Sequence, residues 1–266
     1  MIPRDYITEW RAQAPWVSDS QVEQDLVTCR GLVAIFSHPL LGSSLAFRGG
    51  TALYKLYLKP PARFSEDIDL VQVTAEPAGP VMTALRDVLN PWLGKPRWKQ
   101  SEGRVTFVYR FHSEDVPPLL LRLKVEINTR EHFAILGHVR HPFEINSRWF
   151  SGGCEINTYS LNELLATKLR ALYQRRKGRD LFDLAVGLTS PSVDPDRVVH
   201  AFVEYMRHGN HSVSRAEFER NLQAKLGDPR FTADIGPLLA NGFAWDIETA
   251  AEAVRTQLIG RMPVRM

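Results

Sequence analysis

The sequence predicts an α/β (α+β) fold, with a mixed sheet and N-terminal helices in residues 1–159 and a helical C-terminal lobe in residues 160–266. Residues 44–158 contain short apolar runs separated by turns, a pattern typical of strands. After Tyr159 the apolar residues recur at helical spacing instead. With 266 residues, of which 44% are hydrophobic, the chain can bury a substantial core.

Within the first part, the leading segment is predicted to be helical. Apolar residues recur along residues 21–36, and Ser20 stands where an N-cap is expected. The clearest strands are residues 104–111 and 119–128, which flank a turn rich in proline and acidic residues. One helix is expected before these strands, over residues 81–89, and Asn90-Pro91 should end it.

The C-terminal lobe is predicted to begin at Ser160 and Glu163, whose spacing fits a capping box. Three further helices are expected at residues 196–207, 215–226 and 246–259. The sequence contains no internal repeat and no low-complexity linker, so a change of pattern alone indicates the boundary near residue 159.

The composition excludes several classes of protein. Cys29 and Cys154 form no spaced cluster, so neither a disulfide scaffold nor a cysteine-based zinc site is expected. No apolar run approaches the ~18 residues of a membrane span, and the first residues do not resemble a signal peptide. We therefore expect a cytoplasmic protein without membrane contact. A net charge of +3 does not by itself indicate a nucleic-acid binder, because such binding needs a basic patch.

The most informative motif is a glycine pair followed by two aspartates. Gly49-Gly50-Thr51 precedes a predicted helix, where backbone amides can approach an anion at the positive end of the helix dipole. Asp67 and Asp69 follow on a predicted strand and point the same way, because side chains alternate with period two. The predicted polar face of this strand consists of Arg63, Ser65, Asp67 and Asp69.

Carboxylates beside a phosphate-binding turn are what nucleotidyl transfer requires. Magnesium prefers oxygen ligands and usually binds one or two carboxylates together with substrate phosphates. Asp67 and Asp69 are the expected Mg²⁺ ligands, and Glu126, on the polar face of another strand, is the third candidate ligand, near the incoming hydroxyl. Two simpler interpretations stay open. The aspartates can solubilise an edge strand, and Glu126 can pair with a basic residue on a neighbouring strand.

A lysine on an apolar helix stripe is the next candidate. Lys168 lies on the stripe of the helix over residues 161–173, so it must either snorkel to solvent or meet an anion such as a triphosphate. Asp180 and Asp183 occupy the narrow charged edge of the following helix. Such carboxylates either pair with basic side chains, Lys168 among them, or accept a hydrogen bond from the substrate.

Together these motifs resemble the AbiEii/AbiGii-type nucleotidyltransferase toxins of the DNA polymerase β-like nucleotidyltransferase superfamily. The resemblance covers most of residues 20–190. It rests on RGGTALYK at 48–55, RFSEDIDL at 63–70, the Lys124-Val125-Glu126 strand, and ATKLRAL at 166–172 running into RDLFDL at 179–184. It implies a polymerase β-like nucleotidyltransferase core with a mixed sheet, followed by the helical lobe.

The resemblance also implies a function. Members of the family that these motifs resemble are toxins of bacterial toxin–antitoxin or phage-defence pairs, with a cognate antitoxin protein as partner. Characterised relatives, including the MenT group, transfer a nucleotide from an NTP to the 3′ end of tRNA and so block translation. Two other functions stay open at this point: nucleotidyl transfer to a protein hydroxyl or a small molecule, and a non-catalytic module that binds a nucleotide or a partner.

The residue patterns and the resemblance together give each candidate residue an expected role. The residues expected to bind the nucleotide are Gly49, Gly50, Thr51, Arg63, Ser65, Lys168 and Asp180. The catalytic set is expected to be Asp67, Asp69, Glu126, Lys168 and Asp183, with the first three as the Mg²⁺ ligands. The basic run over residues 175–179 is expected either near an RNA backbone or in a solvated loop.

Overall fold

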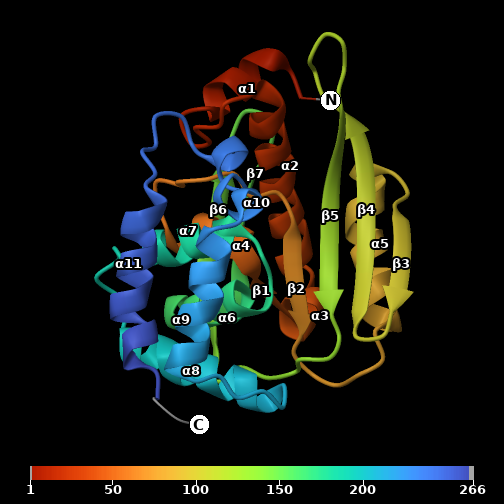
Figure 1. Ribbon diagram of the computed structural model, residues 1–266. Coiled ribbons are helices and arrows are strands. Elements are labelled where there is room, and N and C mark those ends of the chain that lie inside the picture. Colours follow the sequence, from red (N-terminus) through yellow and green to blue (C-terminus); the bar gives the residue numbers. More distant parts are fainter. Residues whose placement is uncertain (1, 264–266) are drawn as a thin grey trace. The chain divides into compact units, whose positions relative to one another are not determined.

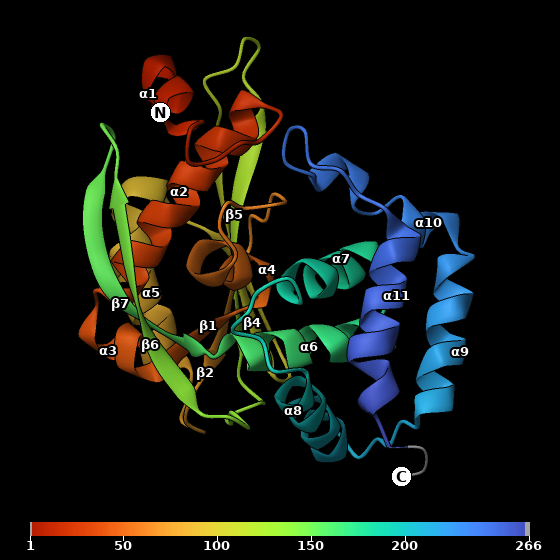
Figure 2. The ribbon, with the colours of Figure 1, turned by 90° about the vertical axis from the view of Figure 1, so that its left-hand side faces the viewer.

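The computed structural model describes residues 2–263 of the 266-residue chain, in two compact units. The first unit comprises the residues up to 133 together with residues 138–159. The second comprises residues 134–137 and the chain from residue 160 onward. Figures 1 and 2 show a mixed sheet with helices in the first unit and helices alone in the second, which confirms the predicted α/β (α+β) class.

A seven-stranded mixed sheet is the framework of the first unit. Its strands are β1 (Leu45–Arg48), β2 (Ile68–Gln72), β3 (Arg97–Ser101), β4 (Arg104–His112), β5 (Leu120–Asn128), β6 (His138–Asn146) and β7 (Ser151–Tyr159). They lie in the order β3–β4–β5–β2–β1–β7–β6. The pairs β2–β5 and β1–β7 are parallel, and the other neighbouring pairs are antiparallel. The sheet brings β1, β2 and β5 together although they are far apart in sequence.

The helices of the first unit flank this sheet. They are α1 (Arg4–Trp10), α2 (Asp19–Phe36), α3 (Pro39–Ser44), α4 (Gly49–Ala52) and α5 (Gly79–Leu93), and a π-helical turn at Leu53–Tyr57 continues α4. The N-cap of α2 is Ser18 rather than Ser20, because the Ser18 hydroxyl accepts from Gln21 N and the Gln21 side chain accepts from Ser18 N. Helix α5 continues past Pro91, which lies in its last turn, and ends where Gly94 takes a φ of 77°.

One face of the sheet carries the core of the first unit. Buried and more exposed side chains alternate along β4 and β5, as predicted. The buried set comprises Val105, Phe107, Tyr109, Phe111, Leu123, Val125 and Ile127. Helix α2 packs on β5 and α5 packs on β4, and in Figure 1 α5 lies behind β3 and β4. The opposite face of these strands therefore carries the polar side chains.

The strand that holds the aspartates is shorter than predicted. β2 begins at Ile68, so Asp69 lies on it and Asp67 directly precedes it. Residues 63–67 are not part of the strand. The alternation of side chains therefore cannot place Arg63 and Ser65, and the predicted polar face from 63 to 69 is wrong in this respect.

The second unit is helical. Its helices are α6 (Leu161–Gln174), α7 (Gly178–Gly187), α8 (Pro195–His208), α9 (Arg215–Leu226), α10 (Pro229–Thr232) and α11 (Ile247–Gln257), with single 3₁₀ turns at Gly236–Leu238 and Ile259–Arg261. The bounds of α9 are those predicted, and those of α8 and α11 lie within two residues of the prediction. Helix α11 begins after Asp246, whose carboxylate accepts from Thr249 N at 2.7 Å.

Glu163 explains why residues 134–137 belong to the second unit. Ser160 caps α6, but the Glu163 side chain does not complete the predicted capping box. Its carboxylate instead accepts hydrogen bonds from Ile135 N at 2.6 Å, Leu136 N at 3.0 Å and the Tyr205 hydroxyl at 2.7 Å. Burial raises the pKa of Glu163, although these three bonds oppose the shift. The buried carboxylate thus ties a non-helical segment to α6 and α8.

We expect Glu163→Ala to lower the free energy of unfolding by about 2–4 kcal/mol, because it leaves two backbone N–H groups and a hydroxyl without their acceptor. Tyr205→Phe removes only one of the three bonds and should cost about 1 kcal/mol. Urea denaturation of the wild type and both variants measures the two losses. Equal losses would show that the carboxylate does not hold residues 135 and 136.

Candidate functional site

Acidic side chains converge at the centre of the sheet. In the register of the strands, Asp69 of β2 lies between Arg48 of β1 and Glu126 of β5. Neighbouring strands are about 4.8 Å apart, so side chains at one register position on one face are neighbours. Asp67 joins this group from the residue before β2, because both it and Glu126 lie within ion-pair distance of one lysine. The fold therefore gathers the three carboxylates that the sequence predicted.

That lysine is Lys124, which had no role in the sequence-based prediction. Its ammonium group lies 2.7 Å from Asp67 Oδ2 and 3.8 Å from Glu126 Oε2. Burial lowers the pKa of Lys124, but its hydrogen bond to Asp67 and the three carboxylate charges outweigh burial and raise it. A signal for this residue was present in the sequence, since Lys124 lies two residues before Glu126 on the same strand face.

The ionised form of Asp69 carries an electrostatic cost. Burial is the main cause that raises the pKa of Asp69, and the charges of Asp67 and Glu126 add to it. Lys124 and Arg48 lower the pKa without cancelling the rise. The charge of Arg48 is shared, because its guanidinium also pairs with Glu131 at 2.7 Å. The cluster thus retains an excess of negative charge.

The glycine turn brings the backbone against this cluster. Gly49 has a φ of 84°, in the left-handed region that favours glycine, and a Cβ there would collide with the Asp69 carboxylate. A Cβ on Gly50 would collide with the Arg63 guanidinium and lie 3.1 Å from Ser65 Oγ. These close approaches require both glycines, and the prediction of a tight turn that opens a helix is confirmed.

Thr51 and Ser65 connect the turn to the aspartates. The Thr51 hydroxyl donates to the Asp67 carbonyl oxygen at 2.6 Å and lies 2.9 Å from Ser65 Oγ. Because Thr51 has one hydroxyl proton and donates it to Asp67, Ser65 donates to Thr51. Ser65 therefore lies beside Gly50, held there by a hydrogen bond and not by strand alternation. Thr51 does not cap the helix, because the N-cap position is Arg48.

Arg63 lies elsewhere than predicted. Only 3% of its surface is exposed, and its guanidinium donates to the Phe64 carbonyl oxygen at 2.9 Å. The guanidinium also lies 5.1 Å from the centre of the Tyr54 ring. Arg63 thus packs beneath the glycine turn and not on a polar strand face beside the aspartates, so the turn is the part of the site that it can support.

The donor chemistry of the cluster fits Mg²⁺. Asp67, Asp69 and Glu126 offer carboxylate oxygens, which magnesium prefers, and their net negative charge favours a divalent cation. As the side chains stand, no three His, Cys, Asp or Glu side chains within residues 2–263 are grouped closely enough to hold a metal ion. The ammonium of Lys124 supplies positive charge beside Asp67 and Glu126. Magnesium binding stays a prediction.

Glu126 also satisfies its simpler interpretation. Arg104 of the neighbouring strand β4 lies 3.5 Å from Glu126 Oε2. This is the cross-strand ion pair that the sequence left open, and the Arg104 side chain is 57% exposed. A pair so exposed contributes about 0–1 kcal/mol to stability. It therefore does not prevent Glu126 from binding another cation.

Lys168, in the second unit, joins two aspartates of α7. Its ammonium group lies 2.7 Å from Asp183 Oδ2 and 3.3 Å from Asp180 Oδ1, and all three side chains are buried. Arg175 donates two hydrogen bonds to Asp180, at 2.6 and 2.7 Å. Burial raises the pKa of Asp180, but the charges of Lys168 and Arg175 outweigh it and lower the pKa. The ion-pair interpretation of both aspartates is confirmed, and their roles toward a nucleotide stay predictions.

The basic run after α6 is largely neutralised within its own unit. Arg175 pairs with Asp180, Arg176 lies 3.5 Å from Asp228, and Lys177 lies 3.4 Å from Asp234. Ion-paired cations attract an RNA backbone less than unpaired ones do. The predicted RNA contact of this run is therefore weaker than its sequence indicates.

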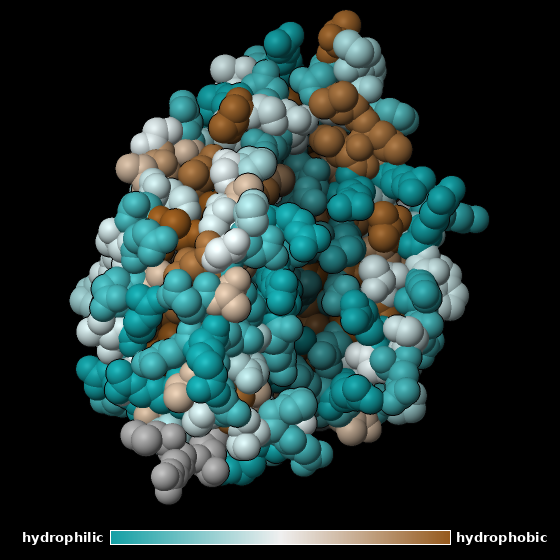
Figure 3. All heavy atoms as spheres, viewed as in Figure 1, coloured by the Kyte–Doolittle hydropathy of each residue, from teal (hydrophilic) through white to brown (hydrophobic). Residues whose placement is uncertain are grey.

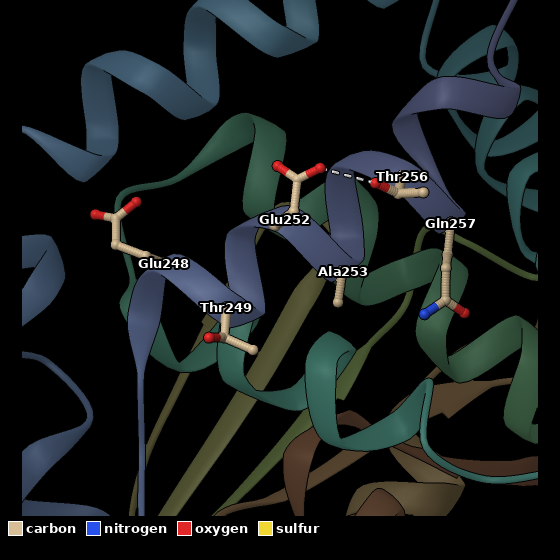
Figure 4. Close-up of a pocket in the computed structure, with 6 residues that line it drawn as sticks. All are labelled: Glu248, Thr249, Glu252, Ala253, Thr256 and Gln257. Atoms are coloured by element: carbon tan, nitrogen blue, oxygen red, sulfur yellow. Dashed lines mark hydrogen bonds between the residues drawn. The ribbon is translucent and has the colours of Figure 1, made fainter.

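A pocket of about 540 Å³ lies along α11 in the second unit, as Figure 4 shows. Its lining residues are Glu248, Thr249, Glu252, Ala253, Thr256 and Gln257. The lining includes carboxylates but no lysine or arginine, and Glu252 accepts a hydrogen bond from Thr256 at 2.9 Å. None of the candidate residues lines this pocket, so it is not part of the predicted site.

Over nearly its whole length, the chain has the fold of a nucleotidyltransferase. MenT4, a nucleotidyltransferase toxin from Mycobacterium tuberculosis, aligns with a TM-score of 0.70 and 18% identity over 98% of this chain and 91% of MenT4. A candidate nucleotidyltransferase from H. pylori aligns with a TM-score of 0.56 and 16% identity over 91% of this chain and 94% of that one. At these identities the likeness shows the fold.

The family follows from the sequence itself. Residues 30–253 match the family described as nucleotidyl transferase AbiEii toxin, Type IV TA system. Because the match spans most of the chain, the protein belongs to the AbiEii nucleotidyltransferase toxin family, and the resemblance seen in the motifs is confirmed. It is a nucleotidyltransferase of a toxin–antitoxin family. Comparison with curated protein sequences gives no match. Among the helices within residues 2–263, none is long and apolar enough to cross a membrane.

In metal-free buffer at pH 7, Asp69→Asn should raise the free energy of unfolding by about 1 kcal/mol, because it removes a carboxylate whose ionised form is disfavoured in the folded protein. A raised folded-state pKa means that this gain is present above that pKa. The gain declines as the pH falls through the raised folded-state pKa and is gone below about 4, where the carboxyl is protonated in both states.

Urea denaturation between pH 3 and pH 8 tests this expectation. The matched control is Glu102→Gln. This substitution removes the same charge from a side chain that is 88% exposed. The control should change stability by less than about 0.5 kcal/mol at every pH. An Asp69→Asn variant that is less stable than the wild type at pH 7 would contradict the electrostatic cost assigned to Asp69.

Lys168→Met should lower the free energy of unfolding by about 3–5 kcal/mol, because it removes the buried ammonium group that contacts the carboxylates of both Asp180 and Asp183. The double variant Lys168→Met/Asp183→Leu, which removes both charges, should recover part of this loss. Thermal and urea unfolding measure both variants. A loss below about 1 kcal/mol for the single variant would exclude a structural role for the pair and leave only a functional one.

Proposed function

We propose that this protein is the toxin of a toxin–antitoxin pair and adds a nucleoside monophosphate from an NTP to the 3′-hydroxyl of an RNA. We further propose that the acceptor is the 3′ end of tRNA, that Mg²⁺ is required and that the modification blocks translation. A cognate antitoxin, a cytoplasmic location and a part in phage defence belong to the same proposal. Membership of the AbiEii toxin family supports these points.

The observation that carries the proposal is the close contact between Gly49 and Asp69. The backbone of the turn approaches the carboxylate so closely that no Cβ fits between them. A triphosphate held by the backbone N–H groups of Gly49 and Gly50 would therefore lie beside Asp69 and its acidic neighbours. Negative phosphates and carboxylates at one point repel each other unless a divalent cation joins them. This arrangement suits metal-assisted transfer of a phosphoryl group.

Each side chain of the cluster has a proposed task. Asp67 and Asp69, with Glu126, would hold Mg²⁺, which when bound supplies positive charge to the reacting phosphate and the leaving pyrophosphate. Ser65, beside Gly50, would turn its one hydroxyl proton from Thr51 to a phosphate oxygen when the nucleotide binds. Lys124 would balance carboxylate charge and keep Asp67 in place.

The proposed reaction conserves all atoms. The 3′-oxygen of the acceptor forms a bond to the α-phosphorus of the NTP, and the bond from that phosphorus to the bridging oxygen of pyrophosphate breaks. Glu126, which lies across Asp69 from Arg48 in the strand register, would accept a hydrogen bond from the attacking hydroxyl. The hydroxyl proton leaves to Glu126 or to solvent, and pyrophosphate is released.

Incubation with total tRNA and each α-labelled NTP in turn tests the proposal. The wild type should label the 3′ end of tRNA, and labelling should stop when EDTA removes divalent metal. Asp69→Asn should reduce the initial rate by at least about 10²–10³-fold, because it weakens the charge stabilisation of the transition state. Glu102→Gln serves again as the control of equal charge change.

The outcomes are distinct. Undiminished labelling by Asp69→Asn would show that the site is wrongly assigned. Label that enters a protein lysate or an aminoglycoside but not tRNA would keep the nucleotidyltransferase activity and replace the acceptor.

A further inference from the structure

The sheet presents a basic face beside the carboxylates. Six cations lie on the side of β3, β4 and β5 opposite the buried core, and we call this surface the basic sheet face: Arg97, Lys99, Arg104, Arg110, Arg122 and Lys124. Among the strand residues on this side, Glu126 is the one carboxylate. In Figure 1 the face is turned toward the viewer, and Figure 3 shows hydrophilic side chains over it, with a hydrophobic patch toward the upper ends of β4 and β5.

The strand register arranges these cations in rows that lead to the carboxylates. One row crosses five strands through Lys99, Thr106, Glu126, Asp69 and Arg48. The next row contains Arg97, Val108 and Lys124, and Lys124 contacts Asp67. A third row contains Arg110 and Arg122. The positive charge therefore continues from the outer edge of the sheet to the candidate site.

Most of these charges are available to a ligand. Arg97, Lys99 and Arg110 are exposed, and within residues 2–263 no ion pair joins them to an acidic side chain. Arg122 is 66% exposed and lies 3.9 Å from Glu66, a long contact. This distinguishes the face from the basic run after α6, in which Arg175, Arg176 and Lys177 are paired with aspartates.

We infer that the basic sheet face is the docking surface for the phosphate backbone of the acceptor RNA. This inference rests on the proposed function and names the surface that delivers the acceptor. Cations two residues apart on a strand are about 6.6 Å apart and neighbouring strands about 4.8 Å apart, so the rows present several charges to a chain of phosphates. Contacts of this kind give affinity without base selection. Because one row passes through Glu126 and Asp69, an RNA strand bound along it from the β3 edge brings its terminal hydroxyl to the carboxylates.

An acidic protein surface is the other ligand that such charges attract. The structure favours RNA, because the rows are continuous with the groups that would react with a 3′-hydroxyl. Attraction of an acidic protein surface requires only exposed positive charge, and it does not require that the charged rows lead to the carboxylates. The two ligands are separated by the experiment below.

The test variant is Arg97→Ser/Lys99→Ser/Arg110→Ser, which removes three exposed cations that touch none of the carboxylates of the site. The matched control is Arg207→Ser/Arg215→Ser/Arg230→Ser, which removes the same charge from arginines of the second unit that are 70%, 46% and 89% exposed. Arg110→Ser alone gives a second, milder variant. Circular dichroism and thermal unfolding verify that all variants are folded.

Binding is measured by the fluorescence anisotropy of 5′-labelled tRNA at several salt concentrations. Every protein in this measurement also carries Asp69→Asn, so that no nucleotide is transferred. Each phosphate contact contributes about 0.7 to the slope of log Kd against log salt, which is about 5-fold in affinity at 0.1 M salt. The triple variant should therefore lose about 2 units of slope and about 100-fold in affinity, and Arg110→Ser about one third of that slope. The control triple should bind within about 2-fold of the parent.

The second measurement is the kinetics of nucleotide transfer, made with the same variants but with Asp69 retained. For the triple variant, KM for tRNA should rise, while KM for the NTP and kcat at saturating tRNA stay within about 2-fold, because the removed charges touch only the acceptor. Equal losses in the test and control triples would overturn the inference. So would unchanged RNA binding combined with lost binding of poly-glutamate, which would make the face a site for acidic protein.

The two proposals fail separately. If the wild type transfers nucleotide to tRNA and the triple variant does so with an unchanged KM, the proposed function stands and the basic sheet face does not bind the acceptor. If tRNA binds through the basic sheet face but no nucleotide is transferred to it, the face is confirmed as an RNA surface and the proposed reaction is wrong.

Discussion

The pairing of β1, β2 and β5 is the constraint on which the site depends. It places Arg48, Asp69 and Glu126 at one register position, although they come from three distant parts of the sequence. The same pairing forces the chain after Arg48 past the Asp69 carboxylate, which is why residue 49 must be glycine. It also orders the basic side chains of β3, β4 and β5 into rows, because register propagates across a sheet.

Asp180 and Asp69 show opposite electrostatics. Asp180 has a lowered pKa, because Lys168 and Arg175 outweigh its burial, and such a group stabilises the fold. Asp69 has a raised pKa, because burial and two neighbouring carboxylates outweigh Lys124 and Arg48. A structural ion pair is complete in itself, whereas a cluster with excess charge is suited to bind a further cation. The difference separates a carboxylate that is neutralised within the fold from one whose charge is not fully compensated.

Much of the fold could be predicted from local pattern. The alternation of Leu123, Val125 and Ile127 with polar residues predicted β5 and the polar position of Glu126, because one face of the strand is buried. Where the prediction was wrong, contacts distant in sequence took precedence over local pattern. Glu163 does not complete the predicted capping box, because its carboxylate binds the backbone N–H groups of residues 135 and 136. The position of Ser65 is fixed by its hydrogen bond with Thr51 and not by a strand. A capping motif cannot reveal that a better partner lies 28 residues away.

By itself, the sequence determined the chemical identity of the candidate site, since glycines beside an aspartate pair and a glutamate on a polar strand face are visible in the order of residues. It also determined the family, because the motifs are specific in combination. Only the tertiary structure decided the neighbours: Lys124 among the carboxylates, Arg63 beneath the turn, and Asp180 and Asp183 around Lys168. The physical reason is that charge and hydrogen bonding act over a few ångströms of space, and strand pairing brings together residues that no sequence spacing connects.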